Sequence, residues 1–245
     1  MATYACSDLH GMLYFYEKIC EMLEPEDIVY FLGDAGDRGP EPWETIKQVA
    51  ANPQFIYLKG NHEDMLEKAL KEYRDLGYHD SYYHLLVCNG GRETFEQCIM
   101  EDTIDKWIKF LKDLPTSITY TNKEGFKIML SHAGFNPFIG KITENVYIPT
   151  EEDLLWDRHH YFTPKWIDCG EDIYIVHGHT PIEYLQYDIE GEISTEEEGY
   201  YPPYRYCEGH KICIDSGAFY TNQFCLLDLD DFSYHHFKLP FKKSF

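Results

Sequence analysis

The chain has 245 residues, and its 43 acidic against 21 basic side chains give a formal net charge of −22. A charge of this sign disfavours attraction to nucleic acid phosphates and to anionic lipids, so neither nucleic acid nor a membrane is an expected partner. Hydrophobic residues make up 44% of the chain, which excludes a disordered polymer and allows a packed core.

Short apolar runs that suit buried strands alternate with segments in which apolar residues recur three and four positions apart, the spacing of a helix. In chain order the prediction is strand Thr3–Cys6, helix Met12–Leu23, strand Ile28–Leu32, helix Trp43–Ala51, strand Phe55–Leu58, helix Asp64–Tyr73, helix Glu93–Leu111 within a helical stretch near 92–113, and strands Phe126–Leu130, Ile173–Val176, Ile212–Ile214 and Phe224–Leu229. The segment 188–206 is rich in Glu, Tyr, Gly and Pro and is predicted to be a long acidic loop. The alternation predicts a layered α/β fold.

The eight cysteines form no C-x-x-C pair, and several lie in apolar runs. We interpret them as small buried hydrophobic residues. The N-terminus has no basic region followed by an apolar segment, so no signal peptide is expected. No apolar run approaches the roughly 20 residues of a membrane span. A reduced, cytoplasmic protein is therefore expected.

Residue types that bind metal ions follow five of the predicted strands. They are Asp8 and His10, then Asp34, Asn61, His132 and His179. Ligands of layered α/β folds bind beyond the carboxyl ends of the strands, so these side chains are expected to meet at one edge. Carboxylate, imidazole and amide donors suit Mn²⁺, Fe or Zn²⁺. One carboxylate, for which Asp34 is a candidate, can bridge two ions.

Each of these residues alone has an ordinary structural explanation. Asp8 could cap a helix, Asp34 could belong to a turn, and Asn61 could form an Asx turn. His132 could be a buried core histidine, and we interpret His177 as structural. Compatible ligands at five separate strand ends, each beside a glycine, are harder to explain by turn chemistry, and they favour a metal site.

Five sequence blocks carry a family resemblance. In chain order they are Asp8-Leu9-His10-Gly11, Gly33-Asp34-Ala35-Gly36-Asp37-Arg38-Gly39, Gly60-Asn61-His62-Glu63, Ser131-His132-Ala133-Gly134 and Gly178-His179-Thr180-Pro181. Together they resemble the phosphoprotein phosphatase (PPP) family of calcineurin-like metallophosphatases, most closely the compact bacterial and phage-lambda serine/threonine phosphatases. The resemblance implies a single metallophosphatase domain over residues 1–245, built as a sandwich of two β-sheets flanked by α-helices.

The resemblance also implies a role for each residue. Asp8, His10 and Asp34 would bind one divalent ion, and Asp34, Asn61, His132 and His179 a second, with Asp34 bridging the two. The ions are expected to be Mn²⁺, with Fe and Zn²⁺ as alternatives. The substrate phosphate would be bound by Arg38 and Arg158, together with Asn61. A hydroxide that bridges the two ions would attack phosphorus directly.

His62 resembles the general acid of the family, which protonates the leaving oxygen. Asp37 resembles its carboxylate partner, which orients the imidazole and raises its pKa. Lys59 departs from the pattern, because many serine/threonine phosphatases have an arginine there that grips phosphate.

The leading functional expectation is a metal-dependent phosphomonoesterase acting on phosphoserine and phosphothreonine, with phosphotyrosine as a further candidate. Its substrate would be a phosphorylated protein or peptide, or a small phosphoester. The alternative is hydrolysis of dinucleoside polyphosphates such as diadenosine tetraphosphate, or of another small phosphoanhydride. The Asp-Arg-Gly, Asn-His-Glu and Gly-His-Thr forms of the blocks favour the first expectation. A catalytically dead scaffold would have lost a ligand or His62, and none is lost.

Overall fold

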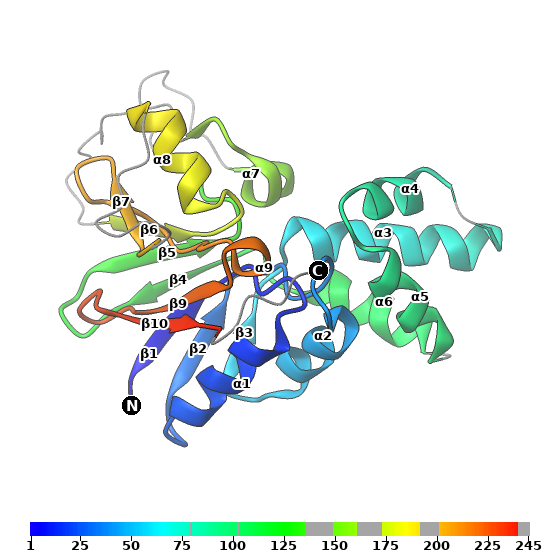
Figure 1. The fold of residues 1–245 in the computed structure, drawn as a ribbon, viewed down its shortest axis with the longest axis horizontal. Helices are drawn as coiled ribbons and strands as arrows, with labels where there is room; N and C mark the ends of the chain where they lie inside the picture. The colour runs from blue at the N-terminus through cyan, green and yellow to red at the C-terminus, as the bar shows by residue number, and fades with distance from the viewer. Residues whose placement is uncertain (79, 102, 136–148, 161–172, 192–200, 240–245) are drawn as a thin grey trace.

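The computed structural model describes residues 1–78, 80–101, 103–135, 149–160, 173–191 and 201–239. At its centre two β-sheets pack face to face, and helices cover their outer sides (Figure 1). This arrangement confirms the predicted α/β fold of two sheets flanked by helices.

The first sheet runs in the order β10 (Tyr234–Lys238), β9 (Gln223–Asp228), β1 (Thr3–Cys6), β2 (Ile28–Phe31) and β3 (Phe55–Tyr57). Strands β1, β2 and β3 are parallel, with Thr3 opposite Ile28 and Val29 opposite Phe55. Strands β9 and β10 join antiparallel on the other side. The three parallel strands therefore end at the same edge of the sheet.

The second sheet runs in the order β4 (Ser117–Thr121), β5 (Lys127–Ser131), β6 (Ile173–His177), β8 (Lys211–Cys213) and β7 (Tyr204–Tyr206). Its central strands β5, β6 and β8 are parallel, and the edge strands β4 and β7 are antiparallel to their neighbours. This sheet too has one edge at which several strands end together.

The helices in chain order are α1 (Leu13–Met22), α2 (Pro42–Ala51), α3 (Asn61–Leu76), α4 (Ser81–Cys88), α5 (Arg92–Met100), α6 (Ile104–Asp113), α7 (Glu151–Trp156), α8 (Ile182–Glu190) and α9 (Ala218–Thr221). The larger core lies on the outer side of the first sheet, where α1, α2, α3, α5 and α6 bury apolar side chains. Helix α8 buries Ile182 and Leu185 in a smaller core on the second sheet.

Successive residues of a strand point to opposite faces, and β1 shows the consequence. Ala5 belongs to the core between the two sheets, and Cys6 belongs to the core beneath the helices. Strands buried on both faces require apolar residues at consecutive positions. This explains why the strands stand out in the sequence as short continuous apolar runs.

The prediction of one helix over Glu93–Leu111 is wrong, because α5 ends at Met100 and α6 begins at Ile104. Cys98 and Trp107 are both buried. They are nine residues apart, and at about 100° per residue they would lie on opposite faces of one continuous helix. The break between the helices allows both side chains to reach the core, where Trp107 packs on Trp43 with ring centroids 4.5 Å apart.

The predicted loop 188–206 is shorter than expected at both ends. Helix α8 continues to Glu190, and strand β7 occupies Tyr204–Tyr206. The central part, with the acidic run Glu196-Glu197-Glu198, lies outside the described residues.

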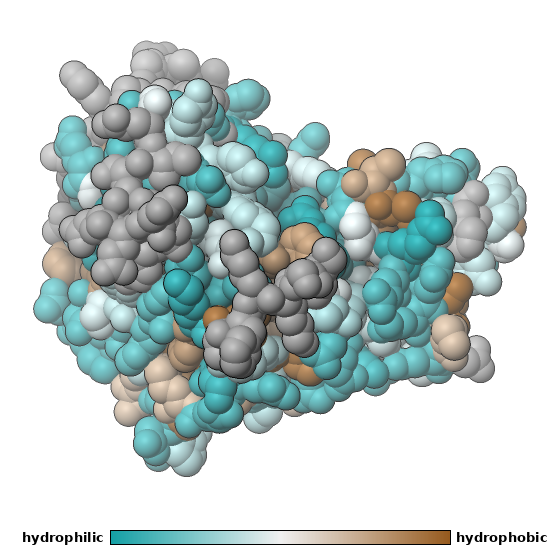
Figure 2. Space-filling model, viewed as in Figure 1, coloured by the Kyte–Doolittle hydropathy of each residue, from teal (hydrophilic) through white to brown (hydrophobic). Residues whose placement is uncertain are grey.

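The visible surface in Figure 2 is mostly hydrophilic, with a hydrophobic patch over α4, where Leu85 is exposed. Among the residues that the structure describes, no helix combines the length and the apolar character needed to cross a bilayer.

Candidate active site

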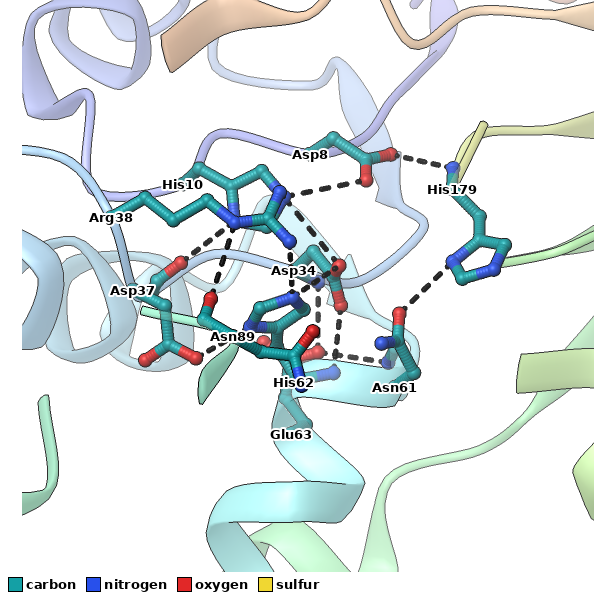
Figure 3. Close-up of polar contacts among 12 residues, drawn as sticks. Asp8, His10, Asp34, Asp37, Arg38, Asn61, His62, Glu63, Asn89 and His179 are labelled. Carbon is teal, nitrogen blue, oxygen red and sulfur yellow. Dashed lines mark hydrogen bonds and ion pairs between the residues drawn. The ribbon is translucent and has the colours of Figure 1, made fainter. Parts of the chain in front are cut away.

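The side chains predicted to bind metal ions lie together beyond the carboxyl ends of the parallel strands of both sheets (Figure 3). The first sheet supplies Asp8 and His10 after β1, Asp34 after β2 and Asn61 at the start of α3, and the second supplies His132 after β5 and His179 after β6. The six residues are 0–6% exposed. The structure thus places all of them in one buried cluster.

The backbone at this edge adopts an unusual conformation. Asp8, His10, Asp34, Asp37, Arg38 and His179 have φ between 45° and 67°, the left-handed region that non-glycine residues rarely adopt. Such strain concentrates at functional sites, where the surrounding structure must hold it. Gly178 allows the closest approach, since a Cβ atom there would lie 2.1 Å from Oδ2 of Asp8. Only glycine lets the turn after β6 lie against that carboxylate.

The first group of candidate ligands is Asp8, His10 and Asp34. The Nε2 atom of His10 lies 3.8 Å from Oδ1 of Asp8 and 3.6 Å from Oδ2 of Asp34. Its Nδ1 atom lies 3.1 Å from the carbonyl oxygen of Gly36, to which it can donate a hydrogen bond. Such a bond to the far nitrogen fixes the ring and turns Nε2 toward the two carboxylates, the orientation that a metal ligand requires.

The second group is Asn61, His132 and His179, with Asp34 beside it. The Nε2 atom of His132 lies 2.8 Å from Oδ1 of Asn61, 3.1 Å from Nδ1 of His179 and 3.5 Å from Oδ2 of Asp34. The Nδ1 atom of His132 lies 2.8 Å from the carbonyl oxygen of Leu32, which orients this ring in the same way. Asp34 therefore lies between both groups, the position that a bridging ligand requires.

The charges of the cluster suit divalent cations. Asp8 and Asp34 are 1% and 2% exposed. Burial raises the pKa of both carboxyl groups, and for Asp34 the neighbouring Glu63 and Asp8 raise it further. Burial lowers the pKa of His10 and His179 well below the usual value, so both rings are neutral, the form that binds metal. Crowded carboxylates and neutral imidazoles form a donor set that fits two divalent ions.

His62 lies beside the cluster, in contact with Asp37 as predicted. Its Nδ1 atom lies 2.5 Å from Oδ2 of Asp37, and Oδ1 of Asp37 accepts a hydrogen bond from the hydroxyl of Thr94. The expectation of a raised pKa at His62 is wrong, because burial and then the charge of Arg38 lower the pKa of this ring well below its usual value. Burial also raises the pKa of the Asp37 carboxyl group, to about 7.

The two predicted phosphate-binding arginines lie at the cluster. Arg38 donates hydrogen bonds from Nη1 to Nε2 of His10 at 2.8 Å and from Nη2 to Nε2 of His62 at 2.9 Å. Arg158 donates from Nε to Nε2 of His179 at 3.2 Å. Both line the same cavity of about 820 Å³, together with Asp34, Asn61 and His62. Two permanent positive charges thus face the space where a phosphate group would bind.

Sequence reasoning missed the part that Glu63 plays. This 1% exposed carboxylate accepts hydrogen bonds from the backbone N–H groups of Asp34 (2.8 Å), Ala35 (3.0 Å) and Gly60 (2.8 Å), and from the hydroxyl of Tyr57 (2.7 Å). It therefore ties the turn after β2 to the start of α3. The position of Asp34 depends on Glu63, which bonds the backbone N–H of Asp34.

Glu63→Gln is expected to weaken this support, because the amide NH₂ group is a donor and would face the N–H and O–H donors that now bond the carboxylate. We expect the free energy of unfolding to fall by about 2–4 kcal/mol. Metal affinity is expected to fall about 10–100-fold, as is typical when a residue behind a metal ligand is changed. Chemical unfolding and calorimetric metal titration measure the two effects. The control is Glu96→Gln at an exposed position of α5. Metal affinity within twofold of the wild type would contradict the role of Glu63.

Asp215 is a second residue that sequence reasoning left without a role. It follows β8, is 3% exposed and lines the cavity. Burial and the nearby Asp8 raise the pKa of its carboxyl group well above the usual value. Its sequence signal was the same as for the predicted ligands, a carboxylate with Gly217 directly after a strand.

Comparison with known proteins agrees with this geometry. The family model described as calcineurin-like phosphoesterase matches residues 1–213. A curated relative, bis(5′-nucleosyl)-tetraphosphatase PrpE (asymmetrical) of Anoxybacillus flavithermus, is 27% identical over 162 residues, which are 62% of this chain. The aligned region spans 63% of that relative's length.

Solved structures share the fold at low identity. A putative diadenosine tetraphosphatase superposes with a TM-score of 0.57 at 17% identity, over 98% of this chain and 94% of its own. A protein serine/threonine phosphatase from Saccharomyces cerevisiae, with similarity to human phosphatase PP5, gives 0.56 at 13% identity, over 98% and 80%. The match to the family model extends over most of the chain and includes all five sequence blocks. The chain therefore belongs to the calcineurin-like phosphoesterase family.

Proposed function

We propose that this phosphoesterase hydrolyses dinucleoside polyphosphates of the diadenosine tetraphosphate type, the alternative function in the sequence analysis. The observation that carries the proposal is the position of Lys59. Its ammonium group donates to Oε2 of Glu67 at 2.9 Å and to Oε1 of Glu151 at 3.4 Å, and the residue is 3% exposed. Lys59 is paired away from the cavity and cannot replace the phosphate-gripping arginine of serine/threonine phosphatases.

The named relative and the named structure support the same substrate class, since each is described as a tetraphosphatase. A net charge of −22 repels polymeric nucleic acid and anionic membranes, so we propose neither as a partner. From the mixture of carboxylate, imidazole and amide donors we propose Mn²⁺ as the resident ion, with Fe and Zn²⁺ as alternatives.

The chain's own residues divide the work of hydrolysis. Arg38 and Arg158 hold the oxygens of the phosphate that is attacked. Nε2 of His62, which accepts from Arg38 Nη2 in the structure, gives a proton to the leaving oxygen once Arg38 has turned to the phosphate and the ring has taken up a proton there, and Asp37 holds the ring in position through Nδ1. Two divalent ions, when bound by the cluster, supply Lewis acidity that activates water and neutralises phosphate charge.

The proposal is tested by comparing kcat/KM for diadenosine tetraphosphate with kcat/KM for a phosphoserine peptide, at equal Mn²⁺. We expect the nucleotide to be preferred at least tenfold. A preference for the phosphopeptide would restore the serine/threonine phosphatase as the function. That second candidate is favoured by the intact Asn-His-Glu and Gly-His-Thr blocks.

Lys59→Ala is expected to change kcat and KM less than about twofold, because Lys59 faces the glutamates and not the substrate. We expect the free energy of unfolding to fall by about 2–4 kcal/mol, since a buried charge pair is broken. Glu67 keeps a partner in Lys71, which limits the loss.

The control for this variant is Lys68→Ala, which removes a 2.7 Å ion pair with Asp64 at a half-exposed position. Such surface pairs contribute about 0–1 kcal/mol. A rise of tenfold or more in KM for Lys59→Ala would show that Lys59 binds phosphate after all.

A further inference from the structure

One side of the cavity is built from aromatic rings. Trp156 at the end of α7, Tyr184 in the first turn of α8, and Phe219 and Tyr220 of α9 all line it. Trp156 joins this wall to the metal ligands, since its ring lies edge-on to His179 with centroids 6.4 Å apart. The aromatic wall therefore begins beside the candidate metal centre and leads away from it.

Backbone geometry holds Tyr220 in place. Gly217 has φ of +70°, and a Cβ atom on it would lie 2.4 Å from Cζ of Tyr220. The ring of Tyr220 therefore lies against the backbone of Gly217. A side chain at position 217 would occupy the space of this ring. Tyr220 also contacts Tyr184, with ring centroids 6.2 Å apart and planes tilted by 47°. This separation means that the two rings touch each other, so a ligand would lie on them and not between them.

Both tyrosines keep open surface. Tyr184 is 58% exposed and Tyr220 is 45% exposed, although both belong to the wall of the cavity. Exposed tyrosines on a cavity wall offer flat faces on which another ring can stack. Their exposure, together with their place on the cavity wall, makes these faces accessible to a ligand.

The charges along the cavity differ from one side to the other. Arg38 and Arg158 lie beside the metal ligands, whereas the exposed Asp188 lines the cavity one turn of α8 beyond Tyr184. Among the described residues that line the cavity, Arg38 and Arg158 are the only arginine or lysine side chains, so this end offers none to bind a second phosphate. The cavity thus fits a ligand with a phosphate at one end and an uncharged aromatic ring at the other. Its volume of about 820 Å³ lies in the range of cavities that hold ligands of nucleotide size.

We propose that Tyr184 and Tyr220 form the stacking surface for a nucleobase of the substrate. This inference rests on the proposed function and names the residues that would make it selective. Stacking on two tyrosines discriminates a substrate that carries a base from one that carries only phosphate and sugar.

The test compares the binding of adenosine 5′-phosphate and ribose 5-phosphate, which differ only in the base. Titration calorimetry with Mn²⁺ is done on the full chain with His62→Asn, which slows hydrolysis of either ligand. We expect the base to strengthen binding about tenfold. Tyr184→Ala and Tyr220→Ala should each reduce that ratio below about threefold. Tyr184→Phe should keep it, because the ring remains.

The matched control is Tyr187→Ala, because Tyr187 lies on the same helix, is 60% exposed and does not line the cavity. It should leave the ratio unchanged. A ratio that stays the same in both Tyr184→Ala and Tyr220→Ala would overturn the inference. The inference would also be overturned if both alanine variants lowered the preference for phosphotyrosine over phosphoserine and left the preference for adenosine 5′-phosphate over ribose 5-phosphate unchanged. Failure of the proposed function is a separate result, in which wild-type protein hydrolyses phosphoserine peptides and not diadenosine tetraphosphate.

Discussion

His62→Asn is expected to lower kcat about 10²–10⁴-fold for a substrate whose leaving oxygen must be protonated. The loss should be much smaller for p-nitrophenyl phosphate, because p-nitrophenolate is stable without a proton. The reason lies in the geometry of the ring, since Nδ1 is held 2.5 Å from Asp37 and Nε2 faces the cavity beside Arg38. Steady-state kinetics with both kinds of leaving group measures the difference.

Bound metal should be retained in this variant, because Asp8, His10 and Asp34 remain. The control is His84→Asn, the same change at an exposed position of α4. Equal losses for good and poor leaving groups would argue against proton donation. Loss of metal would instead make His62 a ligand, a role that its contact with His10 and Asp34 permits.

The strand ends could be predicted from the sequence because each depends on a short local pattern. An apolar run followed by a polar residue with a glycine within two positions predicts both a buried strand and a ligand at its carboxyl end, and this pattern predicts Asp34, Asn61, His132 and His179. The parallel pairing of β1, β2 and β3 then brings the ends together, whatever the details of the helices.

The missed features depend on packing or on backbone conformation. Glu63 supports the site through bonds to backbone N–H groups, and no sequence pattern distinguishes those bonds from an ordinary helix start. The break before α6 follows from where Trp107 meets Trp43, a contact between residues far apart in the chain. The pKa of His62 was misjudged because the sequence shows its partner Asp37 but not its burial or the charge of Arg38.

Asp34→Asn is expected to lose both metal binding and activity. Asp34 Oδ2 lies 3.6 Å from Nε2 of His10 and 3.5 Å from Nε2 of His132, so one oxygen serves both groups of ligands. An amide lacks the charge and the second anionic oxygen that a bridge requires. Changes to residues that support a metal ligand typically lower metal affinity about 10–100-fold. Because Asp34 is itself a ligand, we expect metal affinity and kcat/KM to fall further than this. Metal analysis after dialysis, together with kinetics, measures both.

The control for Asp34→Asn is Asp27→Asn. Asp27 is 5% exposed and lies just before β2, at the opposite end of the strand from Asp34. It accepts hydrogen bonds from the backbone N–H groups of Ala2 and Glu24, so its loss should reduce stability without affecting metal content. Retention of both ions by Asp34→Asn would exclude Asp34 as the bridge.

The unfolding temperature of metal-free protein shows whether Asp34 is a metal ligand or an aspartate that stabilises the fold. Burial, and then Glu63 and Asp8, raise the pKa of Asp34 well above its usual range. A carboxyl group whose pKa is raised by folding lowers the stability of the metal-free protein at every pH above its unfolded pKa, neutral pH included. Asp34→Asn removes this charge and keeps an oxygen for the N–H of His62, so the metal-free variant should unfold no lower than the metal-free wild type. Added Mn²⁺ should raise the unfolding temperature of the wild type and have little effect on the variant. If the metal-free variant unfolds at a temperature well below that of the metal-free wild type, Asp34 stabilises the fold without a cation, and this prediction is wrong.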